Sequence, residues 1–431
     1  MSGTITVLGF LALIGLLLLR MPVAFVMALV GFAGFSYVVS LEGGLSLLSI
    51  DMWGIFSNPD LTVVPMFVLM GSIAYYSGIS GKLYDAGNKF LGRQRGGLSM
   101  ATILACAAFA CICGSTNASA AAMGKVTIPE MKRYNYASSL AAGCVGAGGT
   151  LGILIPPSAI FIIYGVLTEQ SIGKLFASGI FPGILLTGLF VMTIYILCRI
   201  DPSLAPPGFT ASWREKLTAL SGIIVPLIIF MLVMGGMFAG WFTPVEAGAA
   251  GAGGILIIAV IRRQLSWRGF LGALADTTQI TCMVFVIITG AMIFGRFLAV
   301  TRVPFEMSAW IGGLPLSRYT IMALIVFGYL IGGCFMDSLA LITLTIPILL
   351  PVVVDLGFDP IWFGVVIVLV TEMGVITPPV GINVYVIKGV APDIPLNTIF
   401  KGVLPFIIPI LITIGLIIVF PQIALYLPSF I

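Results

Sequence analysis

The chain is a succession of apolar runs of about 16–22 residues, separated by short polar or basic segments. About 20 apolar residues in a helix cross the hydrocarbon core of a bilayer, so each uninterrupted run predicts one membrane span. The segment 41–60 carries acidic residues without Lys or Arg, and we expect it to be a loop; we expect 82–95 to be a basic loop. The predicted spans are 4–19, 22–40, 61–79, 176–198, 218–238, 244–261, 276–298 and 403–425.

Two further runs are interrupted by Pro-Pro pairs. Residues 151–157 read Leu-Gly-Ile-Leu-Ile-Pro-Pro, and residues 373–379 read Met-Gly-Val-Ile-Thr-Pro-Pro. Two prolines remove two backbone donors and clash with the preceding turn, so we expect broken helices at 135–168 and 360–388. The freed polar groups persist in a membrane only where they are buried in protein or line a cavity. Matched breaks in the two halves are typical of a transporter binding site.

Two other apolar segments, 97–131 and 319–351, are interrupted at their centres by small and polar residues. The first breaks at 113–119 and the second at 332–337, and each closes with Thr-Ile-Pro. Basic residues flank both ends of the first segment, so both of its ends are expected on the same side of the membrane. We therefore predict a re-entrant hairpin in each half of the chain.

These landmarks recur at nearly one offset, which predicts an internal repeat. The Thr-Ile-Pro closures begin at Thr127 and Thr345, 218 positions apart, and the Pro-Pro pairs begin at Pro156 and Pro378, 222 positions apart. We expect one repeat over 1–216, ending in a polar, Pro-rich connector at 199–216, and a second over 217–431. Five crossings per half is an odd number, so the second repeat is expected to be inverted relative to the first.

The distribution of basic residues predicts how this arrangement is oriented in the membrane. Roughly 15 of the 20 Lys and Arg residues fall on one side of the predicted topology, and such an excess marks the cytoplasm. Both termini are then expected outside, and the two hairpins enter from opposite sides so that their tips meet near the midplane. The first run lacks a cationic start and a small-residue cleavage site, so we interpret it as a span and not a signal peptide. The predicted fold class is an all-α polytopic membrane protein built from two inverted repeats, each with a re-entrant hairpin and a Pro-Pro-broken helix, which is the architecture of a secondary transporter.

Oxygen-rich hairpin tips facing the two breaks predict cation or substrate sites, because hydroxyl, amide and backbone oxygens suit Na⁺. The first candidate site combines Ser115, Asn117 and Ser119 with Gly152, Ile155 and Pro157. The second combines Gly332, Gly333 and Asp337 with Gly374, Thr377 and Pro379. Half-helix N-termini near the tips would favour an anion, which adds Thr116 beside Ser115 as a candidate substrate contact. The alternative is that small residues only permit close helix packing.

Four charged residues in or near apolar runs carry further hypotheses. Asp337 lies at a hairpin tip, and an ionisable group at that depth predicts cation or substrate contact. Arg296 is interpreted either as a partner for a substrate carboxylate or as a side chain that reaches the membrane interface. Glu246 opens a span and fits a helix N-terminal charge better than a ligand. Glu372 precedes the second break. It is interpreted either as a residue that tunes the cation site or as a member of a buried pair.

Composition excludes several classes of function. Hydrophobic residues make up 60% of the chain and charged residues 8%, which excludes a soluble globular protein. The chain has no His, and its seven cysteines lie mostly inside apolar runs, which argues against an intramembrane enzyme or a metal centre. The sequence does not contain the phosphate-binding Gly-x-x-x-x-Gly-Lys motif, so it does not predict ATP use. Broken helices with closed polar tips also argue against a channel.

A set of segments spread over most of the chain carries a further signal: 65–71, 78–80, 152–158, 174–179, 243–246, 335–337 and 374–381, with Tyr164, Gly165 and Asn383. In these segments the chain resembles the large membrane subunit of the tripartite ATP-independent periplasmic (TRAP) transporters of bacteria. At the first hairpin tip the family tends to carry Ser-Gly-Ser, whereas this chain has Cys113, Gly114 and Ser115.

This resemblance implies a Na⁺-coupled transport subunit of the bacterial inner membrane, with two or more Na⁺ ions as coupling ions. It implies a small membrane subunit of about four helices as one partner and a periplasmic substrate-binding protein as another. The cargo would be a small organic anion such as a C4-dicarboxylate, a sugar acid or sialic acid, carried by an elevator motion of the hairpin domain, with no nucleic acid involved. The alternative is a stand-alone Na⁺- or H⁺-coupled carboxylate carrier that needs no binding protein.

Overall fold

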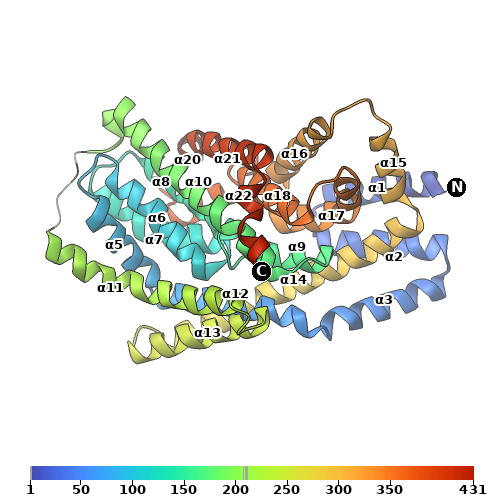
Figure 1. Cartoon of the computed structure of the whole chain (residues 1–431), viewed down its shortest axis with the longest axis horizontal. Coiled ribbons are helices and arrows are strands. Elements are labelled where there is room, and N and C mark those ends of the chain that lie inside the picture. Colours follow the sequence, from blue (N-terminus) through green and yellow to red (C-terminus); the bar gives the residue numbers. More distant parts are fainter. Residues whose placement is uncertain (1, 207, 209–211) are drawn as a thin grey trace.

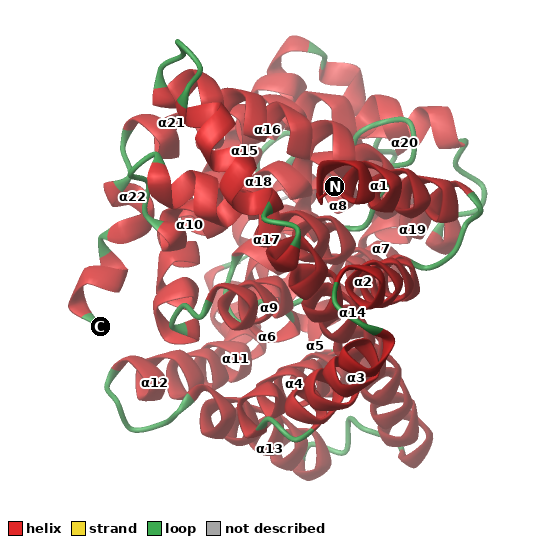
Figure 2. Cartoon of the chain, turned by 90° about the vertical axis from the view of Figure 1, so that its right-hand side faces the viewer, coloured by secondary structure: helices red, strands yellow, loops and turns green. Residues whose placement is uncertain are grey.

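A computed structural model describes residues 2–206, 208 and 212–431, so positions 207 and 209–211 of the predicted connector lie outside the described residues. Throughout the described part the chain forms helices joined by loops and turns, without a strand (Figure 2). Nine helices in this part are long and apolar enough to cross a membrane. The all-α, multi-pass architecture predicted from the apolar runs is confirmed.

The first half contains a hairpin and a broken helix where the sequence predicts them. The hairpin turns at residues 114–115, and the helix breaks at 155–158, at the Pro-Pro pair. The helices are α1 (Ser2–Leu18), α2 (Val23–Val38), α3 (Leu41–Phe56), α4 (Val63–Tyr76), α5 (Ile79–Leu91), the hairpin pair α6 (Gly97–Cys113) and α7 (Thr116–Arg133), the broken pair α8 (Ser138–Leu154) and α9 (Ala159–Thr168), and α10 (Ile172–Ile200).

The second half follows the same order of elements, close to 222 positions later. Its hairpin turns at residues 336–337 and its helix breaks at 375–381. The helices are α11 (Trp213–Phe230), α12 (Gly236–Phe238), α13 (Pro244–Ile261), α14 (Trp267–Val300), α15 (Val303–Gly312), the hairpin pair α16 (Arg318–Phe335) and α17 (Ser338–Asp355), the broken pair α18 (Pro360–Gly374) and α19 (Ile382–Val390), α20 (Leu396–Val403), α21 (Ile407–Val419) and α22 (Gln422–Leu425).

The predicted loop at 41–60 is wrong, because its larger part is the helix α3. Ser40 caps this helix by accepting a hydrogen bond from the N–H of Gly43, and Glu42 lies in the first turn, where a negative charge is favourable. The acidic residues that indicated a loop therefore include a helix-start signal. Adding 222 to the bounds of α3 and α4 gives positions within or next to α14, so one long helix in the second half corresponds to two helices in the first.

The predicted basic loop at 82–95 is also wrong over most of its length. Its residues form the second part of α5, an amphipathic helix that buries Ile79, Leu83 and Tyr84. Such a helix carries its basic residues on the less buried face, so the basic content did not require a loop. Its counterpart in the second half, α15, was not predicted either.

Helices α2 and α14, from the two halves of the chain, pack closely against each other. A methyl group added at Gly31 of α2 would fall 2.7 Å from the backbone nitrogen of Phe294 on α14. Gly290 of α14 lies equally tightly against the backbone of Ala24 on α2. Small residues at both positions let the two backbones approach, which is how membrane helices associate without a hydrophobic driving force.

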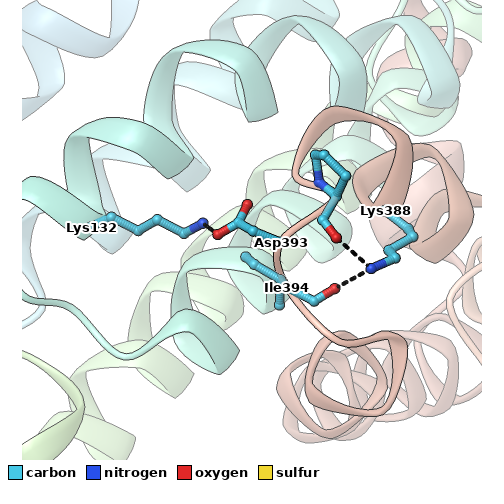
Figure 3. Close-up of polar contacts among 5 residues, drawn as sticks. Lys132, Lys388, Asp393 and Ile394 are labelled. Carbon is cyan, nitrogen blue, oxygen red and sulfur yellow. Dashed lines mark hydrogen bonds and ion pairs between the residues drawn. The ribbon is translucent and has the colours of Figure 1, made fainter.

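The hairpins lie on opposite sides of the molecule in Figure 1, with α6 and α7 toward the left and α16 and α17 toward the right. At the base of the first hairpin, Lys132 of α7 forms an ion pair with Asp393 in the loop before α20 (Figure 3). The hydrogen bond from Lys132 holds the pKa of Asp393 below its usual value. Lys388 of α19 donates hydrogen bonds to the carbonyls of Pro392, at 2.6 Å, and Ile394, at 2.9 Å. These contacts connect the first hairpin to the second broken helix.

Candidate functional site

The tip of the first hairpin lies against the first helix break. Gly114 ends α6 with φ +64°, a left-handed conformation that favours glycine, and a methyl group there would fall 2.7 Å from the carbonyl oxygen of Pro157. The N–H of Ala159 donates a hydrogen bond to the Gly114 carbonyl at 3.4 Å. Ser115 then caps α7 by accepting from the N–H of Ala118 at 3.5 Å. The polar tip and the break are therefore in direct contact, as predicted.

Gly152 brings oxygen atoms of this tip together with the break. A methyl group at Gly152 would fall 2.6 Å from the carbonyl oxygen of Ser115 and 2.9 Å from the hydroxyl oxygen of Ser119. Ser119 is fully buried, and its hydroxyl oxygen has no hydrogen-bond partner of normal geometry in the described part of the chain. A buried hydroxyl without a partner is costly, so an unpaired oxygen beside a second oxygen fits a cation ligand set.

The second tip also lies against the second break, through a different residue of its hairpin. Asp337 caps α17 through a hydrogen bond from the N–H of Leu339 to its carboxylate at 3.1 Å. A methyl group at Gly374 would fall 2.6 Å from the carbonyl carbon of Gly333. The neighbouring Ser338 is buried, and its hydroxyl has no hydrogen-bond partner among the described residues. The second tip therefore supplies one carboxylate and one unpaired hydroxyl.

The two breaks place equivalent glycines against their tips, but the tip residues that they contact are not equivalent, because Gly333 corresponds to Cys111. Ser115 and Asp337 are 222 residues apart and both cap the second helix of a hairpin. Gly152 and Gly374 are also 222 residues apart, and each is packed against its own tip. The peptide bonds preceding Pro157 and Pro379 are both cis.

The remaining predicted ligands are less directly connected to the tips. Thr116 and Asn117 line the cavity described below, whereas the side chain of Ile155 packs toward Gly183 of α10. Gly332 lies against the side chain of Leu341, and the hydroxyl of Thr377 donates to the carbonyl of Met373. Pro379 is exposed. Its role as a ligand stays a prediction, as does that of these residues.

Both tips face one cavity of about 950 Å³. Residues 113–118 of the first tip and 337–340 of the second line it, and so do Pro157 and Ile160 at the first break. The other wall comes from α2, α4 and α14. The lining is mostly apolar, with a few polar groups from each wall, which is typical of a small-molecule site. These polar groups are Ser115, Thr116, Asn117, Asp337 and Ser338 on one side, and Ser72, Tyr75, Tyr76, Asp276 and Gln279 on the other.

Comparison with known families decides the identity of this architecture. Residues 10–423 match the family described as "Tripartite ATP-independent periplasmic transporter, DctM component". The chain belongs to this family of TRAP transporters. Its members are transport proteins and not enzymes, and the predicted resemblance is confirmed.

Several curated TRAP permeases are similar along most of the chain. The C4-dicarboxylate TRAP transporter large permease protein DctM of Pseudomonas aeruginosa is 34% identical over 383 residues, covering 89% of each chain. The sialic acid TRAP transporter large permease protein SiaM of Vibrio cholerae is 33% identical over 417 residues, covering 96% of each. The ectoine/5-hydroxyectoine permease UehC of Ruegeria pomeroyi is 31% identical, covering 97% of each.

Two solved transporter structures share the fold. The YdaH transporter of Alcanivorax borkumensis superposes with a TM-score of 0.62 at 16% identity, covering 89% of this chain and 90% of that one. MtrF of Neisseria gonorrhoeae gives a TM-score of 0.58 at 16% identity, covering 89% and 86%. At this identity the likeness concerns the fold alone.

Arg296, the predicted substrate contact, lies elsewhere in the TRAP fold. Its guanidinium donates to the carboxylate of Asp51 on α3 at 3.3 Å, and the Asp51 side chain is only 4% exposed. Arg296 is absent from the described residues that line the cavity. The structure therefore gives Arg296 a carboxylate partner within the protein, and its contact with a substrate stays a prediction.

Sequence reasoning missed three residues that line the cavity, Tyr75, Tyr76 and Asp276, and also Lys125, which contacts Tyr75. The hydroxyl of Tyr76 donates to Asp276 at 2.9 Å, which connects α4 with α14. The ammonium of Lys125 on α7 donates to the hydroxyl of Tyr75 on α4 at 2.6 Å. Asp276 could have been found as a charge within an apolar helix, but α14 was predicted to begin only at residue 276. Lys125 carried no signal for its partner, because nothing in the sequence shows that α7 faces α4.

The structure shows the surroundings of two further charged residues that were noted in the sequence. Glu246 and Thr243 form a reciprocal cap at the start of α13, so Glu246 acts as a helix N-terminal charge, the favoured interpretation. Glu372 is fully buried in α18, and both of its carboxylate oxygens have no partner among the described residues. The side-chain oxygen of Asn383 on α19 is also buried and without a partner there.

Proposed function

We propose that this chain is the Na⁺-coupled large membrane subunit of a TRAP transporter that imports a small organic anion. The observation that carries the proposal is that each tip packs against its own break, Ser115 and Ser119 against Gly152 and Gly333 against Gly374, and that both tips share one cavity. The first contact places a carbonyl and a hydroxyl oxygen beside the break, and the second places the Gly333 carbonyl oxygen there. The flanking helix N-termini favour a negatively charged cargo. Na⁺ is a co-transported substrate in this proposal, with one ion expected at each tip.

Coupling follows from linkage between the ion sites and the cargo site. Ser115 and Asp337 belong both to the proposed Na⁺ sites and to the cavity lining. An ion that orders the tips therefore raises the affinity for an anion in the cavity, and the anion raises the affinity for the ion by the same factor. The ATP-independent description of the family agrees with an ion gradient as the energy source.

An elevator motion would move the hairpins and broken helices as one body past α2, α4, α13 and α14. The contacts of Lys132 and Lys388 support a joint movement of the hairpins and broken helices, because they join the first hairpin to the second broken helix. The tight packing of α2 on α14 supports a second, rigid body. The cavity extends to Pro22, Tyr76 and Asp276, which lie next to segments of the basic side. The structure thus corresponds to a state open toward the cytoplasm in this proposal.

The cargo class rests on the relatives. They are named for C4-dicarboxylates, sialic acid, isethionate and ectoine. All four chemical classes carry a carboxylate or sulfonate, so a small molecule with such an oxyanion is the proposed cargo. We further propose two partners: a small membrane subunit and a periplasmic substrate-binding protein, at the bacterial inner membrane.

Uptake into proteoliposomes tests this function. The chain would be reconstituted with and without a small TRAP membrane subunit, under an inward Na⁺ gradient, and supplied with labelled succinate, sialic acid or ectoine in the presence or absence of a binding protein. Uptake that requires Na⁺ and the binding protein is expected. Uptake by this chain alone, or uptake driven by a proton gradient without a binding protein, would instead establish a stand-alone carboxylate carrier.

A further inference from the structure

A second hollow, of about 570 Å³, lies at the end of α10 that adjoins the basic side of the protein. The described residues that line it are Gln94 and Arg95 from the segment between α5 and α6, and Tyr195, Cys198 and Arg199 from α10. The hollow is separate from the transport cavity, because the two share no lining residue within the described part of the chain.

The two arginines give this hollow a positive charge that the protein leaves unneutralised. Neither Arg95 nor Arg199 forms an ion pair with a carboxylate in the part of the chain that the structure describes. Asp201 follows closely in sequence, but its carboxylate accepts hydrogen bonds from the N–H and hydroxyl of Ser203. Two guanidinium groups beside one hollow are well shaped to bind the oxygens of a phosphate.

Arg199 is held in place by an aromatic neighbour. Its guanidinium donates a hydrogen bond to the hydroxyl of Tyr195 at 2.9 Å, and its central carbon lies 5.1 Å from the centre of the Tyr195 ring. The segment that carries Arg95 is fixed against the same helix, because a methyl group at Gly96 would fall 2.6 Å from the sulfur of Cys198. Both arms of the hollow are therefore anchored to α10.

The position of the hollow suits the headgroup region of a bilayer. α10 has 29 residues, enough to cross the membrane, and Arg199 lies in its last turn. Met192, Ile196 and Ile200 on the same stretch are 57%, 45% and 76% exposed. An apolar surface thus continues from the basic hollow into the membrane, where it can accommodate an acyl chain.

We propose that this hollow binds the phosphate of an anionic phospholipid, with Arg95 and Arg199 contacting the phosphate oxygens and the acyl chains lying along α10. Basic pockets between membrane helices on the cytoplasmic side recognise such headgroups. The bound lipid would connect the base of the first hairpin, through Arg95, with α10. This site is independent of the proposed Na⁺ coupling, since none of its residues belongs to the tips or breaks.

The test is native mass spectrometry of the purified chain titrated with phosphatidylglycerol or phosphatidylcholine. The double variant Arg95→Gln, Arg199→Gln is compared with Arg262→Gln, Arg268→Gln, which removes two exposed charges from the same side of the protein. Phosphatidylglycerol is expected to bind more tightly than phosphatidylcholine to the wild type. The Arg95, Arg199 variant should lose about tenfold or more of this affinity, and the control pair little.

Other outcomes would overturn the proposal. Equal binding of the two lipids, or equal losses in the two double variants, would show that the hollow does not recognise the lipid phosphate. Displacement of bound phosphatidylglycerol by millimolar inorganic phosphate or glycerol 3-phosphate would assign the hollow to a soluble phosphate compound. The variant Arg95→Lys, Arg199→Lys controls for folding: it keeps the charge, so it should bind more tightly than the glutamine variant.

Discussion

Gly374 lies directly against Gly333, so close that a methyl group at Gly374 would fall 2.6 Å from the carbonyl carbon of Gly333. At Gly152, the equivalent glycine of the first break, a methyl group would fall 2.6 Å from the carbonyl oxygen of Ser115, which is a different position of the tip. Backbone atoms do not yield as a flexible side chain does, so the two glycines fix how near each hairpin tip comes to its break. The oxygen geometry of both proposed ion sites depends on these two contacts.

Alanine at either glycine should therefore disrupt transport. Gly152→Ala or Gly374→Ala pushes the tip away from the break, and overpacking of this kind costs about 1–3 kcal/mol. We expect Na⁺-dependent uptake in proteoliposomes to fall tenfold or more. The matched controls are Gly188→Ala and Gly389→Ala, helical glycines with open space where the methyl would lie. Uptake by Gly374→Ala equal to that of Gly389→Ala would contradict the proposed role of the contact.

Asp337 combines two roles that substitutions can separate. Its carboxylate caps α17, and loss of a cap alone costs about 1 kcal/mol. Asp337→Asn keeps an oxygen that accepts the capping hydrogen bond but removes the negative charge, whereas Asp337→Ala removes both. We expect uptake to be abolished in both variants while membrane insertion is retained. Normal uptake by Asp337→Asn would show that the residue is a structural cap and not a cation or substrate ligand.

The Arg296–Asp51 pair should contribute to stability. Removing Arg296 leaves the buried carboxylate of Asp51 unpaired, which costs about 1–3 kcal/mol. Arg296→Met is expected to lower the Tm in detergent, and the double variant Arg296→Met, Asp51→Asn should recover most of the loss. Uptake by the double variant decides the second role: recovery assigns Arg296 to the pair alone, whereas uptake that stays lost while the Tm recovers supports contact with the substrate.

The hydrogen bond between Lys125 and Tyr75 connects a hairpin helix with α4, so an elevator motion must break it. Lys125→Met should therefore shift the resting protein away from the cytoplasm-open state. Cys282 is exposed and lines the cavity, which makes its labelling rate with a polar maleimide a measure of cavity opening. We expect slower labelling in Lys125→Met than in wild type, and no change in the exposed control Lys401→Met. Unchanged labelling in both would mean that the contact does not favour this state.

The sequence was most informative where glycine and proline interrupt apolar runs. Both hairpins and both breaks lie within a few residues of the predicted positions, because Pro-Pro pairs and small polar tips stop a helix for local reasons. Segment 41–60 was wrongly predicted to be a loop from its acidic residues, whereas Glu42 supports a helix start and Asp51 is buried beside Arg296. That pairing joins residues 245 positions apart.

The remaining features that the sequence did not predict are contacts between helices that are far apart in the chain. The partner of Lys125, the pairing of Tyr76 with Asp276 and the shared cavity all depend on how the halves pack, which no local pattern specifies. The sequence predicted that Gly152 and Gly374 each lie beside their tips, but which tip residue each glycine contacts most closely required the folded structure. The partner of Arg296 likewise required the folded arrangement of α3 and α14.

The central claim is that the two tip–break contacts bind Na⁺, and thermal unfolding of the purified chain tests it most directly. A ligand that binds only the folded state raises the Tm as its concentration increases. We predict a higher Tm in NaCl than in KCl at equal ionic strength for the wild type and for Gly389→Ala, with the difference reduced in Gly152→Ala or Gly374→Ala and absent when both are combined. Identical unfolding of the wild type in NaCl and KCl over the full concentration range would contradict the account.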